Sequence, residues 1–138
     1  MRRVLFALTL FLTIVCVACG MSENKESAAL ATGEFRVKFE QEKYDQIWAS
    51  TSPEFRKSTS QAEFTKLLQK IHEKLGSTVD VNSGSYNVNY GPSGTIVTLG
   101  YQTKFQKGDA AETFVWRIGD GQAQLVGYNI NSKELILN

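Results

Sequence analysis

The hydrophobic pattern of the chain changes its period at Gly76, and this change limits the folds that the chain can adopt. Before Gly76, apolar residues recur every three or four positions, as on one side of a helix. After Gly76 they alternate, as in a strand. A chain whose helices precede its strands predicts an α+β domain, in which helices cover one face of an antiparallel sheet. The length of 138 residues is sufficient for one such domain.

The clearest predicted helix lies between Ser60 and Gly76. Ser60 and Glu63 match a capping box, which satisfies free backbone N–H groups at the start of a helix. Gly76 is suited to end the helix, because glycine readily adopts the backbone conformation found after a last turn. The apolar stripe of this helix consists of Phe64, Leu67, Leu68, Ile71 and Leu75.

We expect three helices before the sheet. The first covers residues 26–40, where Ala28, Ala31, Phe35 and Phe39 fall at helical spacing. The second is short and begins at Tyr44. Ser52 and Pro53 after it have the pattern of a helix cap and a first turn.

Four strands are predicted after Gly76. Glycine, proline and aspartate mark three turns at 91–94, 107–109 and 119–121. The stretch 83–85 (SGS) interrupts the first alternation and shifts its parity, which is typical of a bulge. The residues expected on one face of the last three strands are Val97, Leu99, Tyr101 and Phe105, then Phe114, Trp116 and Ile118, then Val126, Tyr128 and Ile130.

Residues 1–18 have the features of an export signal. Arg2 and Arg3 precede a run from Val4 to Val15 that holds no charged residue. The run suits the core of a signal peptide, and it is shorter than the roughly 20 apolar residues of a membrane-spanning helix. We therefore predict that the remainder of the chain is exported.

Residues 16–20 (CVACG) resemble a bacterial lipoprotein box, although Cys16 stands where leucine is usual. The resemblance implies cleavage before Cys19 and acylation of its thiol, which anchors the protein to a membrane of the cell envelope. That membrane would be the outer one in a cell with two. Ordinary secretory cleavage is the alternative. Residues 19–25 are then a short tether, and 26–138 a single domain with an apolar C-terminal tail.

Composition excludes several classes of protein. Lys plus Arg is 15 and Asp plus Glu is 14, so the chain lacks the basic excess of a nucleic-acid-binding protein. A hydrophobic content of 42% excludes a disordered chain. One histidine and two cysteines cannot form a His/Cys zinc site. No motif for a cofactor is present, and we expect none.

Two pairs of stretches carry a family resemblance. They are 44–48 (YDQIW) with 52–56 (SPEFR), and 112–117 (ETFVWR) with 125–130 (LVGYNI). Together with the element order, they resemble the cystatin-like, nuclear-transport-factor-2-like superfamily. The closing Gly-Tyr-x-Ile is similar to a bacterial exported family of unknown function within it. The resemblance implies a cone, in which a curved sheet wraps a long helix and can leave a pocket at the wide end.

Enzymes of this superfamily that resemble ketosteroid isomerase use an aspartate base in an apolar pocket. None of the four aspartates in this sequence falls on a predicted pocket face. Candidate pocket-lining residues are His72, Tyr101, Glu112, Trp116, Gln124 and Tyr128. Of these, His72 is expected at the boundary of a helix stripe, and Glu112 is expected to be solvated at the start of its strand. No residue is assigned as catalytic.

The sequence therefore favours a membrane-anchored envelope lipoprotein, a non-enzymatic module that binds a protein partner or a small apolar ligand. The alternative is an enzyme or carrier acting on a small hydrophobic molecule, with Glu112 or His72 as the base. Dimerisation is open as well. It would use the opposite sheet face, on which Ile96, Gly100, Val115 and Leu125 are expected.

Overall fold

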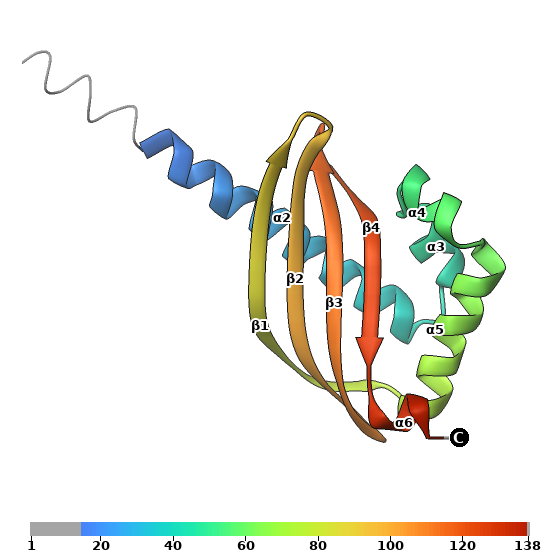
Figure 1. Cartoon of the computed structure of the whole chain (residues 1–138). Coiled ribbons are helices and arrows are strands. Elements are labelled where there is room, and N and C mark those ends of the chain that lie inside the picture. The colour runs from blue at the N-terminus through green and yellow to red at the C-terminus, as the bar shows by residue number, and fades with distance from the viewer. Residues whose placement is uncertain (1–14, 138) are drawn as a thin grey trace, which may run out of the picture.

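The structure is a computed structural model that describes residues 15–137. It confirms the predicted α+β class, with N-terminal helices packed on a four-stranded antiparallel sheet (Figure 1). The elements are α2 (Val15–Glu40), α3 (Tyr44–Ala49), α4 (Pro53–Ser58), α5 (Gln61–Leu75), β1 (Thr78–Gly91), β2 (Gly94–Phe105), β3 (Gly108–Gly119), β4 (Gln122–Asn131) and α6 (Lys133–Ile136).

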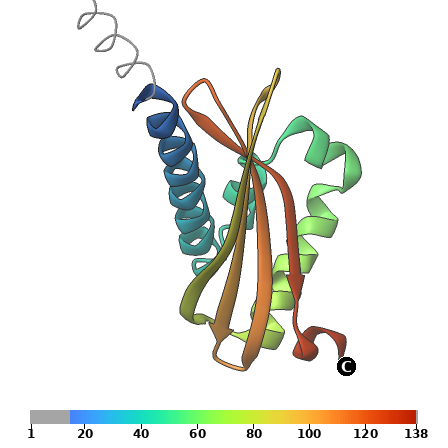
Figure 2. The same ribbon diagram turned by 60° about the vertical axis from the view of Figure 1, so that its left-hand side comes forward.

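The sheet is a simple meander in the order β1-β2-β3-β4, and it is open, not closed into a barrel. The turns that join β1 to β2 and β3 to β4 lie at the end of the molecule where α2 begins, and the C-terminus lies at the other end (Figure 2). On the outer side of β4, the backbone N–H of Leu125 donates to the carbonyl of Ser50 at 2.8 Å, and the carbonyl of Leu125 accepts from the backbone N–H of Ser52 at 2.9 Å. The segment between α3 and α4 thus covers part of that edge.

Two features of the helices differ from the prediction. Helix α2 begins at Val15 and not at Glu26, so residues 20–25 of the predicted tether are helical. Gly20 is unfavourable inside a helix, but residues 21–25 contain no proline, glycine or β-branched residue. The second difference is that residues 53–58 form a helix of their own, α4, capped by Ser52, whose hydroxyl accepts from the N–H of Phe55 at 3.1 Å. Four described helices therefore precede the sheet, and not three.

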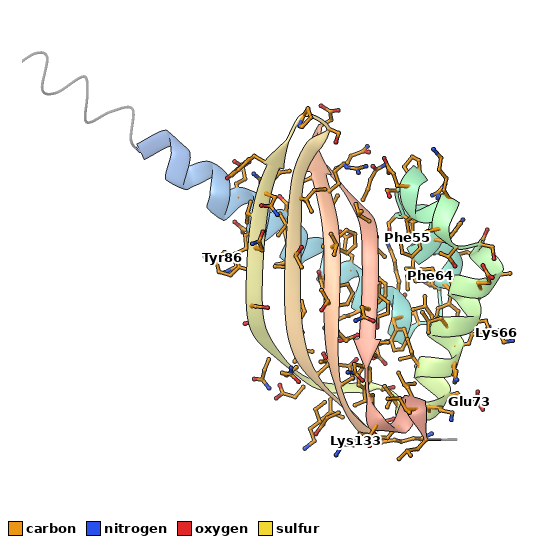
Figure 3. All side chains as sticks on the ribbon, viewed as in Figure 1. Phe55, Phe64, Lys66, Glu73, Tyr86 and Lys133 are labelled. Atoms are coloured by element: carbon orange, nitrogen blue, oxygen red, sulfur yellow. The ribbon has the colours of Figure 1, made fainter. Side chains whose placement is uncertain are left out.

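Helix α5 has the predicted bounds. Ser60 and Glu63 form the full capping box, and Gly76 follows the last turn with a φ of 75°, which suits glycine. The apolar stripe is buried except at Leu67, which is exposed. Figure 3 shows Phe55 and Phe64 together between α4 and α5, and their ring centroids are 4.9 Å apart.

The predicted bulge in β1 is confirmed, since the β1–β2 register shifts between Ser83 and Tyr86. A second shift, in the β3–β4 pair, was not predicted. Val115 pairs with Gly127 but Trp116 pairs with Leu125, so one extra residue is inserted in β4. Leu125 is consequently fully buried under the helices, and its predicted place on the opposite sheet face is wrong.

The remaining turns follow the sequence closely. Residues 120–121 turn β3 into β4 with positive φ at both positions, as a tight two-residue hairpin requires. The β2–β3 turn lies one residue earlier than predicted, because Phe105 pairs with Gly108. In the C-terminal tail, Leu135 packs on the core and Ile136 is exposed. No helix within residues 15–137 is long and apolar enough to cross a membrane.

Candidate functional site: the Glu112 cluster

Glu112 is a carboxylate buried between α2 and the sheet. Only 3% of its surface is exposed, so the prediction of a solvated side chain is wrong. The reason is the length of β3, which begins at Gly108 and places Glu112 inside the strand, paired with Tyr101 on β2 and Ile130 on β4. A charge at such a position needs compensation from neighbouring groups.

Three side chains supply that compensation. Arg36 of α2 lies 2.8 Å from Oε2 of Glu112. The hydroxyl of Thr103 on β2 donates to the same oxygen at 2.6 Å, and the hydroxyl of Tyr128 on β4 donates to Oε1 at 2.8 Å. Both carboxylate oxygens therefore accept hydrogen bonds. The contacts of this one side chain on β3 connect it to α2, β2 and β4.

Arg36 is held by more than its charge. Its guanidinium lies 5.2 Å from the ring centroid of Tyr101 and 5.4 Å from that of Phe114, within the range of cation–π attraction. A second nitrogen donates to Thr103 at 3.3 Å. The side chain is 16% exposed, so water can reach only part of it. Its planar fork suits this partly buried position better than a lysine ammonium would.

The cluster perturbs its tyrosines. Burial, followed by the negative charge of Glu112 and the hydrogen bond to it, raises the pKa of Tyr128 well above its ordinary value. Burial also raises the pKa of Tyr101. Both phenols are thus stable as neutral hydroxyls, and Tyr128 remains a hydrogen-bond donor to the carboxylate.

A groove of about 540 Å³ lies beside the cluster, between α2 and the β3–β4 hairpin. Its apolar lining consists of Leu30, Ala31, Phe35, Trp116, Ile118 and Ala123. At its floor the indole N–H of Trp116 donates to the hydroxyl of Thr32 at 2.9 Å. A smaller cavity of about 220 Å³ lies near the β1 bulge and includes Tyr101. Glu112 lines neither the groove nor this smaller cavity.

The structure brings together Tyr101, Glu112 and Tyr128 in the cluster, and it places Trp116 in the groove. It does not bring in Gln124. The bulge in β4 pairs Gln124 with Arg117, one position along from the pair formed by Trp116 and Leu125, so Gln124 lies on the opposite face of the sheet. The prediction that it shares a pocket face with Trp116 is wrong.

His72 lies apart from the cluster, on α5. Its Nδ1 is 3.3 Å from a carboxylate oxygen of Glu42, and its ring meets the ring of Phe39 edge to face at 5.3 Å. It is partly exposed, as expected of a residue at the boundary of the helix stripe. Cys19 belongs to α2, and its side chain lies outside the described part of the structure.

Arg36 and Thr103 are not among the site residues predicted from the sequence. A signal for Arg36 was present, since it follows Ala28 and Thr32 at intervals of four residues, on the side of α2 that is buried. Thr103 lies between Tyr101 and Phe105 on the same face of β2. Among the side chains that the structure describes, no three His, Cys, Asp or Glu residues gather as metal ligands.

The fold and the cluster define a class of α+β protein in which a long N-terminal helix is fixed to an open antiparallel sheet by a buried ion pair. The chain belongs to a family described as "Protein of unknown function (DUF4019)", whose model matches residues 31–128. That span contains all five residues of the cluster, namely Arg36, Tyr101, Thr103, Glu112 and Tyr128. No curated protein matches the chain.

The cluster predicts a strong, non-additive effect of charge removal. Glu112→Gln leaves Arg36 without its counter-ion, and Arg36→Met leaves the carboxylate unpaired, so each change should lower the free energy of unfolding by about 3 kcal/mol. The double variant removes both charges and should recover most of this loss. Urea unfolding measures all three.

Glu54→Gln is the matched control for this experiment. It breaks an exposed ion pair with Arg117, whose atoms are 3.0 Å apart, and should cost far less than Glu112→Gln. Losses that simply add in the double variant would show that Arg36 and Glu112 do not act as a pair.

The raised pKa of Tyr128 predicts a decline of stability in alkali. Above the ordinary tyrosine pKa of about 10, the unfolded chain loses this proton while the folded chain keeps it. The unfolded state then binds fewer protons, so stability falls as pH rises, by up to about 1.4 kcal/mol per pH unit for one group.

Urea unfolding between pH 8 and about pH 11 tests this prediction. Tyr128→Phe should be less stable at neutral pH, because Glu112 loses a donor, and its decline with pH should be shallower than the parent's. Tyr90→Phe, an exposed position on β1, is the control. Equal slopes for Tyr128→Phe and the parent would refute the assignment.

Proposed function

We propose that the protein is a lipoprotein of the bacterial cell envelope that serves as a non-enzymatic binding module. In this proposal residues 1–18 are removed as a signal peptide, and Cys19 carries the lipid. The domain binds a protein partner or a small apolar ligand. The outer membrane is the proposed location in a cell that has two membranes.

The observation that carries this proposal is the continuity of α2 from Val15 to Glu40. Cys19 and Arg36 lie on the same helix, about 25 Å apart at 1.5 Å per residue. Since Arg36 is bonded to Glu112, a lipid on Cys19 would be joined to the sheet by a stiff helix. The two hairpins at the same end of the molecule would then face the membrane (Figure 2).

The groove between α2 and the β3–β4 hairpin is the proposed binding surface. Its apolar floor contains Phe35 and Trp116, and its rim carries Glu23, Glu34, Lys38 and Asp120. An apolar floor with a polar rim suits a hydrophobic side chain or a small apolar molecule whose polar end stays at the surface.

The second candidate is an enzyme or carrier for a small hydrophobic molecule, and the burial of Glu112 next to the Tyr128 hydroxyl favours it. Its weakness is that both oxygens of the carboxylate are already engaged, and that the groove does not include Glu112. We therefore prefer the binding module.

The long helix on an antiparallel sheet also supports the proposed membership of the nuclear-transport-factor-2-like superfamily.

The intact mass of the protein extracted from its own membranes tests the proposal. A mature chain that begins at an acylated Cys19 is the expected result. Cys19→Ser should lose the acyl groups and leave the membrane fraction. Cys16→Ser is the matched control, because residue 16 is removed with the signal peptide and the mature mass should not change. A mature chain without acyl groups would favour ordinary secretory cleavage.

Native mass spectrometry of the same extract shows what stays bound. Ala31→Trp fills the groove, and Ala62→Trp adds the same side chain at an exposed position on α5. A partner or small molecule that is lost only in Ala31→Trp would support binding in the groove. Loss in neither variant would place the binding surface elsewhere, and turnover that depends on Glu112 would favour the enzyme.

A further inference from the structure

The outer edge of β1 is a long sheet edge to which the described chain adds no further strand. β1 has a single neighbour, β2, whereas β4 is bridged on its outer side by Thr51. An uncovered edge presents unpaired backbone N–H and C=O groups and can pair with another strand. Figure 3 places Tyr86 at this free side of the sheet.

The last part of β1 lacks the usual protection of an edge. Both register shifts of this strand lie before Tyr86, and the stretch 86–91 (YNVNYG) contains no charged residue and no proline. Tyr86 and Tyr90 are 56% and 60% exposed. Charges, prolines and bulges within a strand keep an edge from pairing, and their absence from this stretch points to a partner strand. The nearby charge of Lys25 on α2 lies over the ring face of Tyr86, 3.8 Å from its centroid.

The sequence of this stretch indicates which strand that is. Residues 86–90 (YNVNY) are the same in both directions. If two copies pair antiparallel about Val88, Tyr86 lies opposite Tyr90 of the other copy, Asn87 lies opposite Asn89, and Val88 lies opposite itself. Aromatic pairs then form on one face of the joined sheet and amide pairs on the other, and no charge meets a like charge.

The hydrogen-bonding directions agree with this register. Gly91 and Gly94 close a two-residue turn and are therefore a hydrogen-bonded pair. Hydrogen-bonded and non-hydrogen-bonded pairs alternate along an antiparallel ladder, so Tyr90, Val88 and Tyr86 each belong to a non-hydrogen-bonded pair with β2. Tyr86, Val88 and Tyr90 therefore turn their N–H and C=O groups away from β2. These are the residues that a pairing centred on Val88 would join, with about six hydrogen bonds between the copies.

We propose that β1 is a dimerisation edge, at which residues 86–90 of two copies pair antiparallel about Val88 and join the two sheets into one. The two-fold axis runs perpendicular to the sheet, so both α2 helices lie on the same face. Such an interface is isologous and closed. Because only about five residues of each copy pair, we expect the buried surface area to be smaller than the roughly 1,200 Å² of a stable complex. The dimer should therefore dissociate on dilution.

Sedimentation velocity of the full chain in detergent, over a wide range of concentration, tests the proposal with two paired variants. Asn87→Lys with Asn89→Lys places like charges opposite each other and should give a monomer. Asn87→Lys with Asn89→Glu places opposite charges in the same register and should keep the dimer. Both positions are exposed, so the fold should tolerate either pair. A monomeric parent, or a dimer unaffected by the two lysines, would overturn the proposal.

Disulfide trapping tests the register. Val88→Cys should form a disulfide between copies, since opposite residues of a bonded pair lie about 5.5 Å apart. Val79→Cys is exposed on the same strand and is the control, because its two copies would lie at opposite ends of the joined strands. A crosslink at 79 but not at 88 would refute the register. A crosslink in the parent chain would show a free thiol at Cys16 or Cys19 and would contradict the proposed acylation of Cys19. The dimer proposal would still be tested separately by the two paired variants at positions 87 and 89.

Discussion

The contact between Arg36 and Glu112 is the interaction on which the arrangement of helix and sheet depends. An isolated carboxylate at this depth would be strongly unfavourable, and the charge that offsets it comes from α2 and not from a neighbouring strand. The pair therefore forms only when α2 lies in one position along the sheet. Buried ion pairs add little net stability over a well-packed apolar core, and in some proteins their role is to exclude arrangements that would leave a charge unpaired. In this protein, we expect the pair to fix the position of α2.

Two further contacts attach α2 to the sheet on the N-terminal side of Arg36. The bond from Trp116 to Thr32 joins the helix to β3 one turn before Arg36. Lys25 lies over the ring of Tyr86 at 3.8 Å and joins the helix to β1. The groove lies between the helix and the β3–β4 hairpin, so its width depends on these contacts.

The sequence was sufficient to predict the order of elements because their signals are local. The capping box at Ser60, the glycine at Gly76 and the hairpin residues 120–121 each act within a few positions. The candidate site was harder, because its members meet only in three dimensions. Glu112 was predicted to be solvated because the start of β3 was placed too late, and its partner Arg36 is distant in sequence. The extra residue in β4 reversed the expected faces of Gln124 and Leu125, since a shift of one residue exchanges the two sides of a strand.

Hydrogen exchange of the backbone amides in α2 measures directly whether Arg36 and Glu112 fix this helix to the sheet. Exchange rates of α2 and of the sheet are compared in the parent and in Arg36→Met, under conditions where both chains are folded. We expect faster exchange in α2 of the Arg36→Met variant, with β2 and β3 retaining their protection, because the helix loses its attachment while the sheet keeps its own hydrogen bonds. Unchanged exchange in α2, or an equal loss in all elements, would contradict this expectation.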